Sequence, residues 1–204
     1  PPATSLTSLY ERNRKLYKEY RAYICDSAIH YLNKNIELAG KMNDRMKQDE
    51  SKLLLSYQLA SSGMYKEAVD ILESIDRGTI NARFLTDYYS CFDHVYGELA
   101  FYTQDKVSSA GYRKISDAYK DSLFHVVDHS TDLYLSMKET AYRDNSEFAE
   151  ALQVNDMRLS KVKSGTPEYA LITFHRALAF KQNGDRNQEK KFLALSALSD
   201  IQSA

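Results

Sequence analysis

The chain is almost free of residues that break helices. Its 204 residues include only three prolines and seven glycines, and no proline occurs between Pro2 and Pro167. A sheet protein with many hairpins needs frequent turns, which Gly and Pro usually supply, so an all-β fold is excluded. Apolar residues instead recur at helical spacing, as Ala28, Leu32 and Ala39 do. These features predict an all-α fold.

The helical pattern and its punctuation divide the chain into hairpins. Thr166, Pro167 and Glu168 form a helix start, and Gly63 suits the left-handed residue that ends a helix. No Gly/Ser-rich or Pro-rich linker is present, which favours a single domain over residues 1–204. We predict ten helices, over residues 4–22, 24–43, 49–62, 64–76, 80–104, 107–126, 129–143, 146–163, 167–183 and 186–202.

A repeat of about 40 residues links the hairpins. A small residue recurs in the second helix of each pair at Ala28, Ala68, Ala110 and Ala151, with Glu189 at the fifth position. The small side chain lets the two helices of a pair pack closely. The register at Ala110 is the least clear, because its neighbours could start a helix or form a loop. The repeat predicts about five antiparallel helix pairs in succession, with a period near the ~40 to 47 residues of HEAT-type units.

Several stretches resemble a known family. Residues 63–68, Gly-Met-Tyr-Lys-Glu-Ala, resemble the turn and second helix of a tetratricopeptide repeat. Together with residues 23–28, 35–39, 60–65, 87–90 and 192–201, they resemble a Bacteroidetes family of tetratricopeptide-containing proteins assigned as transcriptional regulators. The resemblance covers most of the chain and implies a tetratricopeptide-like, right-handed superhelix.

The resemblance implies an N-terminal helical-repeat region, often exported, in a regulator that is anchored in the inner membrane and carries a cytoplasmic DNA-binding region. This chain would then be a fragment of a longer regulator. Its expected location is periplasmic or otherwise exported, with a cytoplasmic location left open. As a sensory or interaction domain it would bind a peptide, a protein or a small ligand.

Composition and motifs argue against other classes. The formal net charge is -1, so no overall field attracts nucleic acid. The chain has no apolar run of the roughly 20 residues that cross a bilayer, so this segment is not expected to insert into a membrane. It also lacks the GxxxxGK[ST], GxGxxG and GxSxG motifs. We expect a protein that is not an enzyme and needs no cofactor.

Two pairs of residues leave metal or redox chemistry open. His125 and His129 stand four residues apart, which on a continuous helix places both imidazoles on one face, as in an H-x-x-E-H zinc site with Asp128 replacing Glu. The alternative is a solvated corner between two helices, which we favour over a metal-dependent hydrolase. Cys25 and Cys91 lack zinc-ligand spacing, and a bridge between them is left open.

Tyrosine is abundant, with 16 Tyr and no Trp. In tetratricopeptide arrays the first helix of each pair lines a concave groove. The repeat register assigns eight residues to that groove: Tyr10, Asn13, Tyr17, Arg21, Tyr57, Tyr102, Arg143 and Lys181. The same tyrosines could instead form the core between repeats. A surface glycan-binding role is the alternative function, and the absence of Trp counts against it. Homo-oligomerisation is left open.

Overall fold

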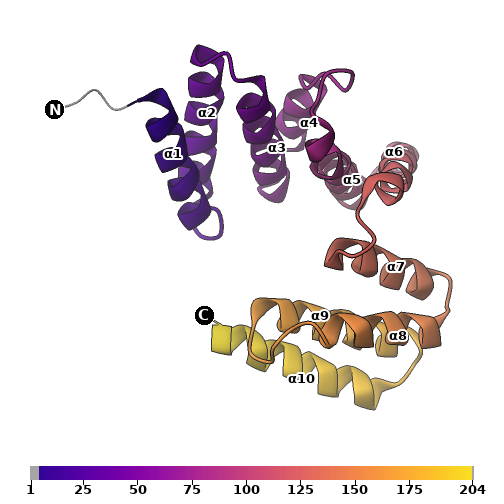
Figure 1. The fold of residues 1–204 in the computed structure, drawn as a ribbon. Helices are drawn as coiled ribbons and strands as arrows, with labels where there is room; N and C mark the ends of the chain where they lie inside the picture. The colour runs from indigo at the N-terminus through magenta and orange to yellow at the C-terminus, as the bar shows by residue number, and fades with distance from the viewer. Residues whose placement is uncertain (1–4, 204) are drawn as a thin grey trace. The chain divides into compact units, whose positions relative to one another are not determined.

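The computed structural model describes residues 5–203, which form ten α-helices and no strand (Figure 1). The helices are α1 (Leu6–Tyr20), α2 (Cys25–Lys41), α3 (Arg45–Ser61), α4 (Tyr65–Glu73), α5 (Leu85–Tyr102), α6 (Lys106–Val126), α7 (Asp132–Asp144), α8 (Phe148–Leu159), α9 (Pro167–Gln182) and α10 (Arg186–Ser203). A short 3-10 helix, η1 (Ala82–Phe84), precedes α5. The all-α prediction is confirmed, and each predicted helix overlaps one of these ten.

Capping explains where the observed helix starts differ from the predicted ones. The Asp44 side chain accepts a hydrogen bond from the Lys47 amide, so α3 begins at Arg45, four residues before the predicted start. The Thr131 hydroxyl caps α7 in the same way through the Tyr134 amide, so α7 begins only at Asp132. Thr166 caps α9 with Pro167 in its first turn, as the sequence predicts.

Four helices end in one backbone pattern. A residue with positive φ follows the helix, and the next amide donates to the carbonyl five residues before it, as in a Schellman motif. Two of the four residues are glycines, which adopt this conformation without strain, and the other two carry a Cβ. The four residues are Asn43, Gly63, Ser146 and Gly184.

Replacement of Ser146 by glycine is expected to stabilise the chain. Ser146 has a φ of 63° after α7, where Gly63 and Gly184 stand after α3 and α9. Relief of the left-handed strain should raise the free energy of unfolding by about 1 kcal/mol. Urea denaturation followed by far-UV circular dichroism measures the change. The control is Ser160→Gly, because Ser160 has a φ of -65° and glycine there should destabilise. Equal changes in the free energy of unfolding at the two positions would show that the backbone of Ser146 is not strained.

The helices group into two compact units, residues 5–126 and residues 127–203. The N-terminal unit holds three helix pairs, α1/α2, α3/α4 and α5/α6, and α3 also packs against α5. The C-terminal unit holds the pairs α7/α8 and α9/α10, with α8 against α9. That the units act together as one domain stays a prediction.

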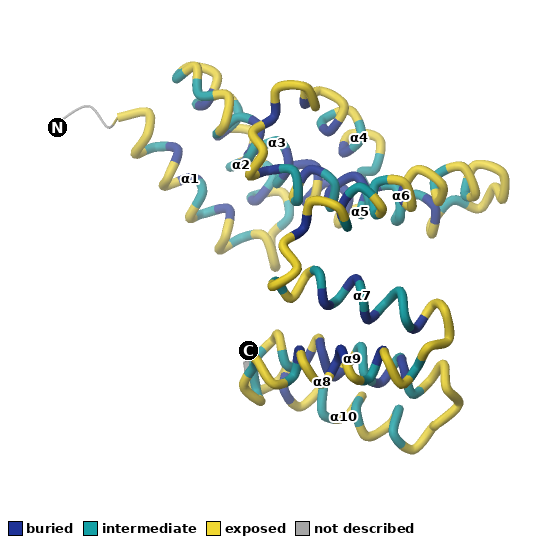
Figure 2. Tube along the Cα trace, turned by 45° about the vertical axis from the view of Figure 1, so that its right-hand side comes forward, coloured by how far each residue is buried: buried dark blue, intermediate teal, exposed yellow. Residues whose placement is uncertain are grey.

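The N-terminal unit is built around α3, which is buried along much of its length (Figure 2). Ala28 and Ala68 are fully buried in the second helices of the first two pairs, as the repeat predicts. Ala110 is exposed in the first turns of α6, so its register is wrong. Ser116 takes the close-packed position instead, and its hydroxyl donates to the Asp93 carboxylate on α5 at 2.6 Å.

The C-terminal unit repeats the small-residue packing once. Ala151 of α8 is fully buried, whereas Glu189 of α10 is only partly buried near the start of its helix. The contact between α9 and α10 is made further along, where the Ser196 hydroxyl donates to the Ala170 carbonyl at 2.7 Å and Ser199 is buried. The fifth repeat position therefore does not fall on a small residue at the contact.

A charged cluster fills the interior of the C-terminal unit. Arg158 of α8 is 1% exposed, and its Nε and Nη2 donate to the two carboxylate oxygens of Asp132, each at 2.8 Å. Its Nη1 donates to the buried Glu139 carboxylate at 2.6 Å and to His175 Nδ1 at 3.0 Å. The Asn155 amide donates to the other Glu139 oxygen at 3.0 Å. The buried charges are thus paired and hydrogen-bonded.

The pKa values of Asp132 and His175 are both lowered in this cluster. The pKa of Asp132 lies below its usual value because Arg158 donates to its carboxylate. The pKa of His175 falls to about 4, first because burial disfavours the charged ring and then because Arg158 and Arg143 repel it. His175 is therefore neutral near pH 7, which fits its role as an acceptor for Arg158.

Candidate ligand pocket of the N-terminal unit

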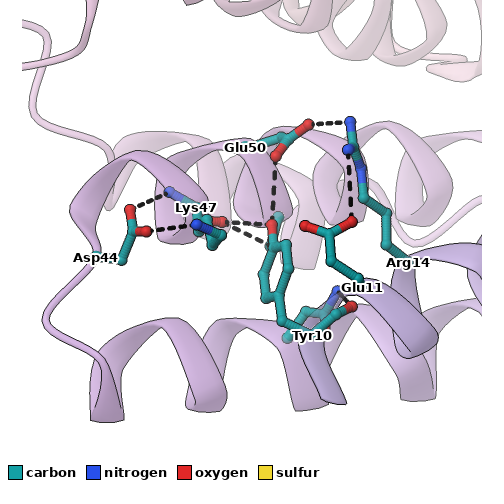
Figure 3. Close-up of polar contacts among 8 residues, drawn as sticks. Tyr10, Glu11, Arg14, Asp44, Lys47 and Glu50 are labelled. Carbon is teal, nitrogen blue, oxygen red and sulfur yellow. Dashed lines mark hydrogen bonds and ion pairs between the residues drawn. The ribbon is translucent and has the colours of Figure 1, made fainter. Parts of the chain in front are cut away.

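Polar side chains connect α1 to α3. The Tyr10 hydroxyl lies 3.0 Å from Ser51 Oγ and 3.3 Å from Glu50 Oε2, and Arg14 donates to Glu50 Oε1 at 2.6 Å (Figure 3). Burial of the ring raises the pKa of Tyr10 to about 12, and the Glu50 charge adds to the rise. Tyr10 therefore stays protonated, and Glu50 is held in place by two partners from α1.

Three of the predicted groove residues, all on α1, are packed inside the unit. Tyr10, Asn13 and Tyr17 are 2%, 5% and 5% exposed. Burial also raises the pKa of Tyr17. The Asn35 amide of α2 donates to the Tyr10 carbonyl at 3.2 Å, which fixes α1 on α2. These positions agree with the core alternative for the tyrosines, and their contact with a ligand stays a prediction.

A pocket of about 230 Å³ opens between α3 and α5, and we call it the α3–α5 pocket. Its residues combine an apolar wall with polar and acidic groups. They are Glu50, Leu53, Leu54, Tyr57, Phe84, Asp87, Ser90 and Cys91. Of the predicted groove residues, Tyr57 belongs to this pocket. Its side chain is 49% exposed, and its ring stacks on that of His94 at a centroid distance of 4.4 Å.

The polar groups of the α3–α5 pocket differ in what they contact. The pKa of Asp87 is raised, first by desolvation and then by the charge of Glu50. Ser90 Oγ is buried and has no hydrogen-bond partner among the described residues. Cys91 Sγ lies 3.5 Å from the Leu53 carbonyl, and burial raises the pKa of this thiol to about 12. The thiol is therefore protonated and a poor nucleophile.

Both cysteines are free, so no disulfide joins Cys25 to Cys91. Cys25 Sγ lies 2.6 Å from Ser62 Oγ and also contacts the Gln58 amide, so its neighbours are polar groups of α3 and the turn after it. Cys91 lies in the wall of the α3–α5 pocket.

The other predicted groove residues lie outside this pocket. Arg21 is exposed at the end of α1, and the exposed Tyr102 stacks on Tyr65 at 6.0 Å. Arg143 and Lys181 belong to the C-terminal unit, where Lys181 is exposed. Arg143 is buried; its Nη2 donates to Thr140 Oγ1 at 3.2 Å, while its Nε has no partner among the described residues. Their binding role stays a prediction.

The spacing of His125 and His129 does not produce a shared helical face, because α6 ends at Val126. His125 Nδ1 lies 2.7 Å from the Asp121 carbonyl, and His129 stacks on Tyr134 at 4.1 Å. Asp128 instead organises the turn by accepting from the Ser130 amide at 2.8 Å. The continuous helix that a zinc pair would need is therefore absent, and His129 lies in the turn between α6 and α7.

Residues 5–203 contain no group of three or more His, Cys, Asp or Glu side chains placed to hold a metal ion. None of the helices in this range combines the length and apolar character that a transmembrane span requires.

The chain is similar in fold to solved tetratricopeptide-like repeats. Two solved chains match, both from crystal structures of the nearly identical TPR-like repeats of a candidate kinesin light chain from Podosopora anserina, one of them a variant. Each is 16% identical to this chain and covers 97% of it and 95% of its own length, with TM-scores of 0.52 and 0.54. This likeness shows the fold.

No curated protein matches the chain. The family model described as the SusR N-terminal TPR domain matches residues 2–204. The all-α, tetratricopeptide-like fold that the resemblance implies is therefore confirmed, and the chain belongs to the SusR N-terminal TPR domain family.

Proposed function

We propose that this chain is a non-enzymatic recognition domain that binds a peptide segment of a partner protein in the α3–α5 pocket. The family assignment and the tetratricopeptide-like fold support a protein-interaction role. In the wider proposal, which follows from the family resemblance, the chain is the exported sensory part of a membrane-anchored transcriptional regulator.

The observation that carries the proposal is the α3–α5 pocket itself. It opens at the contact between the first helices of two neighbouring pairs, and Leu53, Leu54 and Phe84 provide apolar surface for a side chain. Tyr57 adds a half-exposed aromatic ring, a residue type that is enriched at interfaces because it has an apolar body and a polar tip. Burial raises the pKa of the Cys91 thiol in the wall to about 12, so this thiol is protonated and a poor nucleophile.

A peptide selection tests the proposal. The purified chain is immobilised and challenged with a random library of short peptides displayed on phage. Retained peptides are then measured against Tyr57→Ala, which should weaken binding about tenfold because it removes the exposed aromatic wall. Tyr23→Ala is the matched control, since Tyr23 is 88% exposed and lies outside the pocket. Failure to retain any peptide, or equal affinity for both variants, would contradict the proposal.

A further inference from the structure

One acidic group of the α3–α5 pocket, Asp87, has no positively charged partner among the described residues. Arg14 pairs with Glu50 rather than Asp87, and none of the ion pairs formed by residues 5–203 includes Asp87. The charge of Glu50, which is also negative, acts on Asp87 and raises its pKa further. A carboxylate that is partly desolvated beside another carboxylate is stabilised by a cation.

Ser90 gives a second, independent sign of a missing ligand. Its Oγ is buried without a partner among the described residues, one helical turn after Asp87 on the same face of α5. A buried hydroxyl that makes no hydrogen bond is unfavourable, and most such groups have a partner. Both residues line the same pocket, next to the apolar Leu54 and Phe84.

Among the described residues, the other charged and titratable groups around the α3–α5 pocket are already paired or are neutral, so they do not offset the charge of Asp87. From α1, Arg14 is held by Glu50, and Arg21 acts on the Tyr17 hydroxyl. On α5, His94 has its pKa lowered, mainly by burial, so its ring is neutral near pH 7. Cys91 is protonated.

We propose that the α3–α5 pocket binds a lysine or arginine side chain of a peptide, with the cationic tip held by Asp87 and Ser90 and the aliphatic stem against Leu54 and Phe84. An ammonium or guanidinium group carries several N–H donors, which match the carboxylate and hydroxyl acceptors of this wall. The inference rests on the proposed function, because it names the chemical class of the peptide that the pocket selects.

Small probes test the charge preference directly. Amide chemical shifts of the labelled chain are recorded during titration with n-butylammonium, pentanoate and glucose at matched ionic strength. We expect n-butylammonium to shift amides of residues 53–57 and 84–91, with a dissociation constant about tenfold lower than that of pentanoate. Equal affinity for cation and anion, a stronger response to glucose, or no response to the cation would overturn the inference.

A pair of isosteric variants isolates the carboxylate. Asp87→Asn should raise the dissociation constant for n-butylammonium about tenfold, because the amide has the same shape without the charge. Asp117→Asn is the control, since Asp117 is exposed on α6 outside the pocket and its replacement changes the net charge equally. Equal weakening in both variants would show that only the overall charge matters, which would overturn the inference.

The selected peptides separate this inference from the proposed function. If retained peptides carry a lysine or arginine whose replacement by norleucine abolishes binding, the inference is supported. If they bind in a Tyr57-dependent way without any basic residue, the recognition function stands and the cation preference is wrong. If no peptide is retained, the proposed function fails, and the butylammonium titration still tests the pocket by itself.

Discussion

Replacement of Arg158 by methionine is expected to lower the free energy of unfolding of the C-terminal unit by about 3–5 kcal/mol. Arg158 is 1% exposed and donates to Glu139, which is equally buried, at 2.6 Å. Methionine has an apolar side chain of similar length, so the volume is largely kept while the Glu139 charge loses its partner. A buried charge without a partner costs far more than the pair contributes.

Urea denaturation followed by far-UV circular dichroism measures this loss, and hydrogen exchange at the amides of α8 and α9 assigns it to the C-terminal unit. Arg186→Met is the control, because Arg186 is exposed at the start of α10 and should change stability by less than about 0.5 kcal/mol. Adding Glu139→Gln to Arg158→Met should restore part of the loss, since the amide keeps an acceptor for Asn155 without the charge. A double variant no more stable than Arg158→Met would show that the loss of stability does not come from the unpaired charge of Glu139.

Acid should weaken the C-terminal unit through His175. The pKa of this ring is about 4 in the folded chain, whereas an unperturbed histidine has a pKa of 6.5, so the unfolded chain binds the proton first as the pH falls. The free energy of unfolding should therefore decrease between pH 6.5 and pH 4, by about 2 kcal/mol after allowance for solvent screening. Below pH 4 the folded ring also becomes protonated, and this contribution stops changing.

The variant His175→Asn tests that pH dependence, because the asparagine Oδ1 can accept from Arg158 in place of Nδ1 without titrating in this range. Urea unfolding at several pH values from 4 to 6.5 should give a shallower slope for the variant than for the original chain. A direct check is the His175 ring signal in NMR, which should titrate near pH 4. Equal slopes in the two proteins would show that another group causes the acid weakening.

Local signals in the sequence predict most of the helix layout. Three residues mark helix boundaries. Gly63 and Gly184 adopt the left-handed backbone conformation after a helix, and Pro167 lies in the first turn of α9, where a residue without an N–H is favoured. Ser146 takes the same backbone conformation as Gly63, although serine has no preference for it, so its position depends on the turn that the flanking helices impose. Ala110 shows the limit of repeat arithmetic, because it is exposed on α6 while its neighbour Ser109 and the later Ser116 bond to α5.

The candidate site could be predicted only in part. The repeat register assigns Tyr57 to the groove, and Tyr57 lines the α3–α5 pocket. Asp87 and Ser90 share a face of α5 by their spacing, but that this face lines a pocket with α3 depends on packing. The partners of Arg158 come from α7 and α9, the helices on either side of α8 in the sequence. Which charged side chains of neighbouring helices pair depends on packing that a single sequence pattern does not encode.

The site at which a peptide binds is the most direct test of whether the α3–α5 pocket recognises it. A peptide retained in the phage selection is titrated into the labelled chain, and the perturbed amides are mapped on the N-terminal unit. We predict perturbations on α3 and α5, concentrated at residues 50–57 and 84–91, and their loss in Tyr57→Ala. Perturbations confined to α2 and α4, or unchanged by Tyr57→Ala, would contradict the claim.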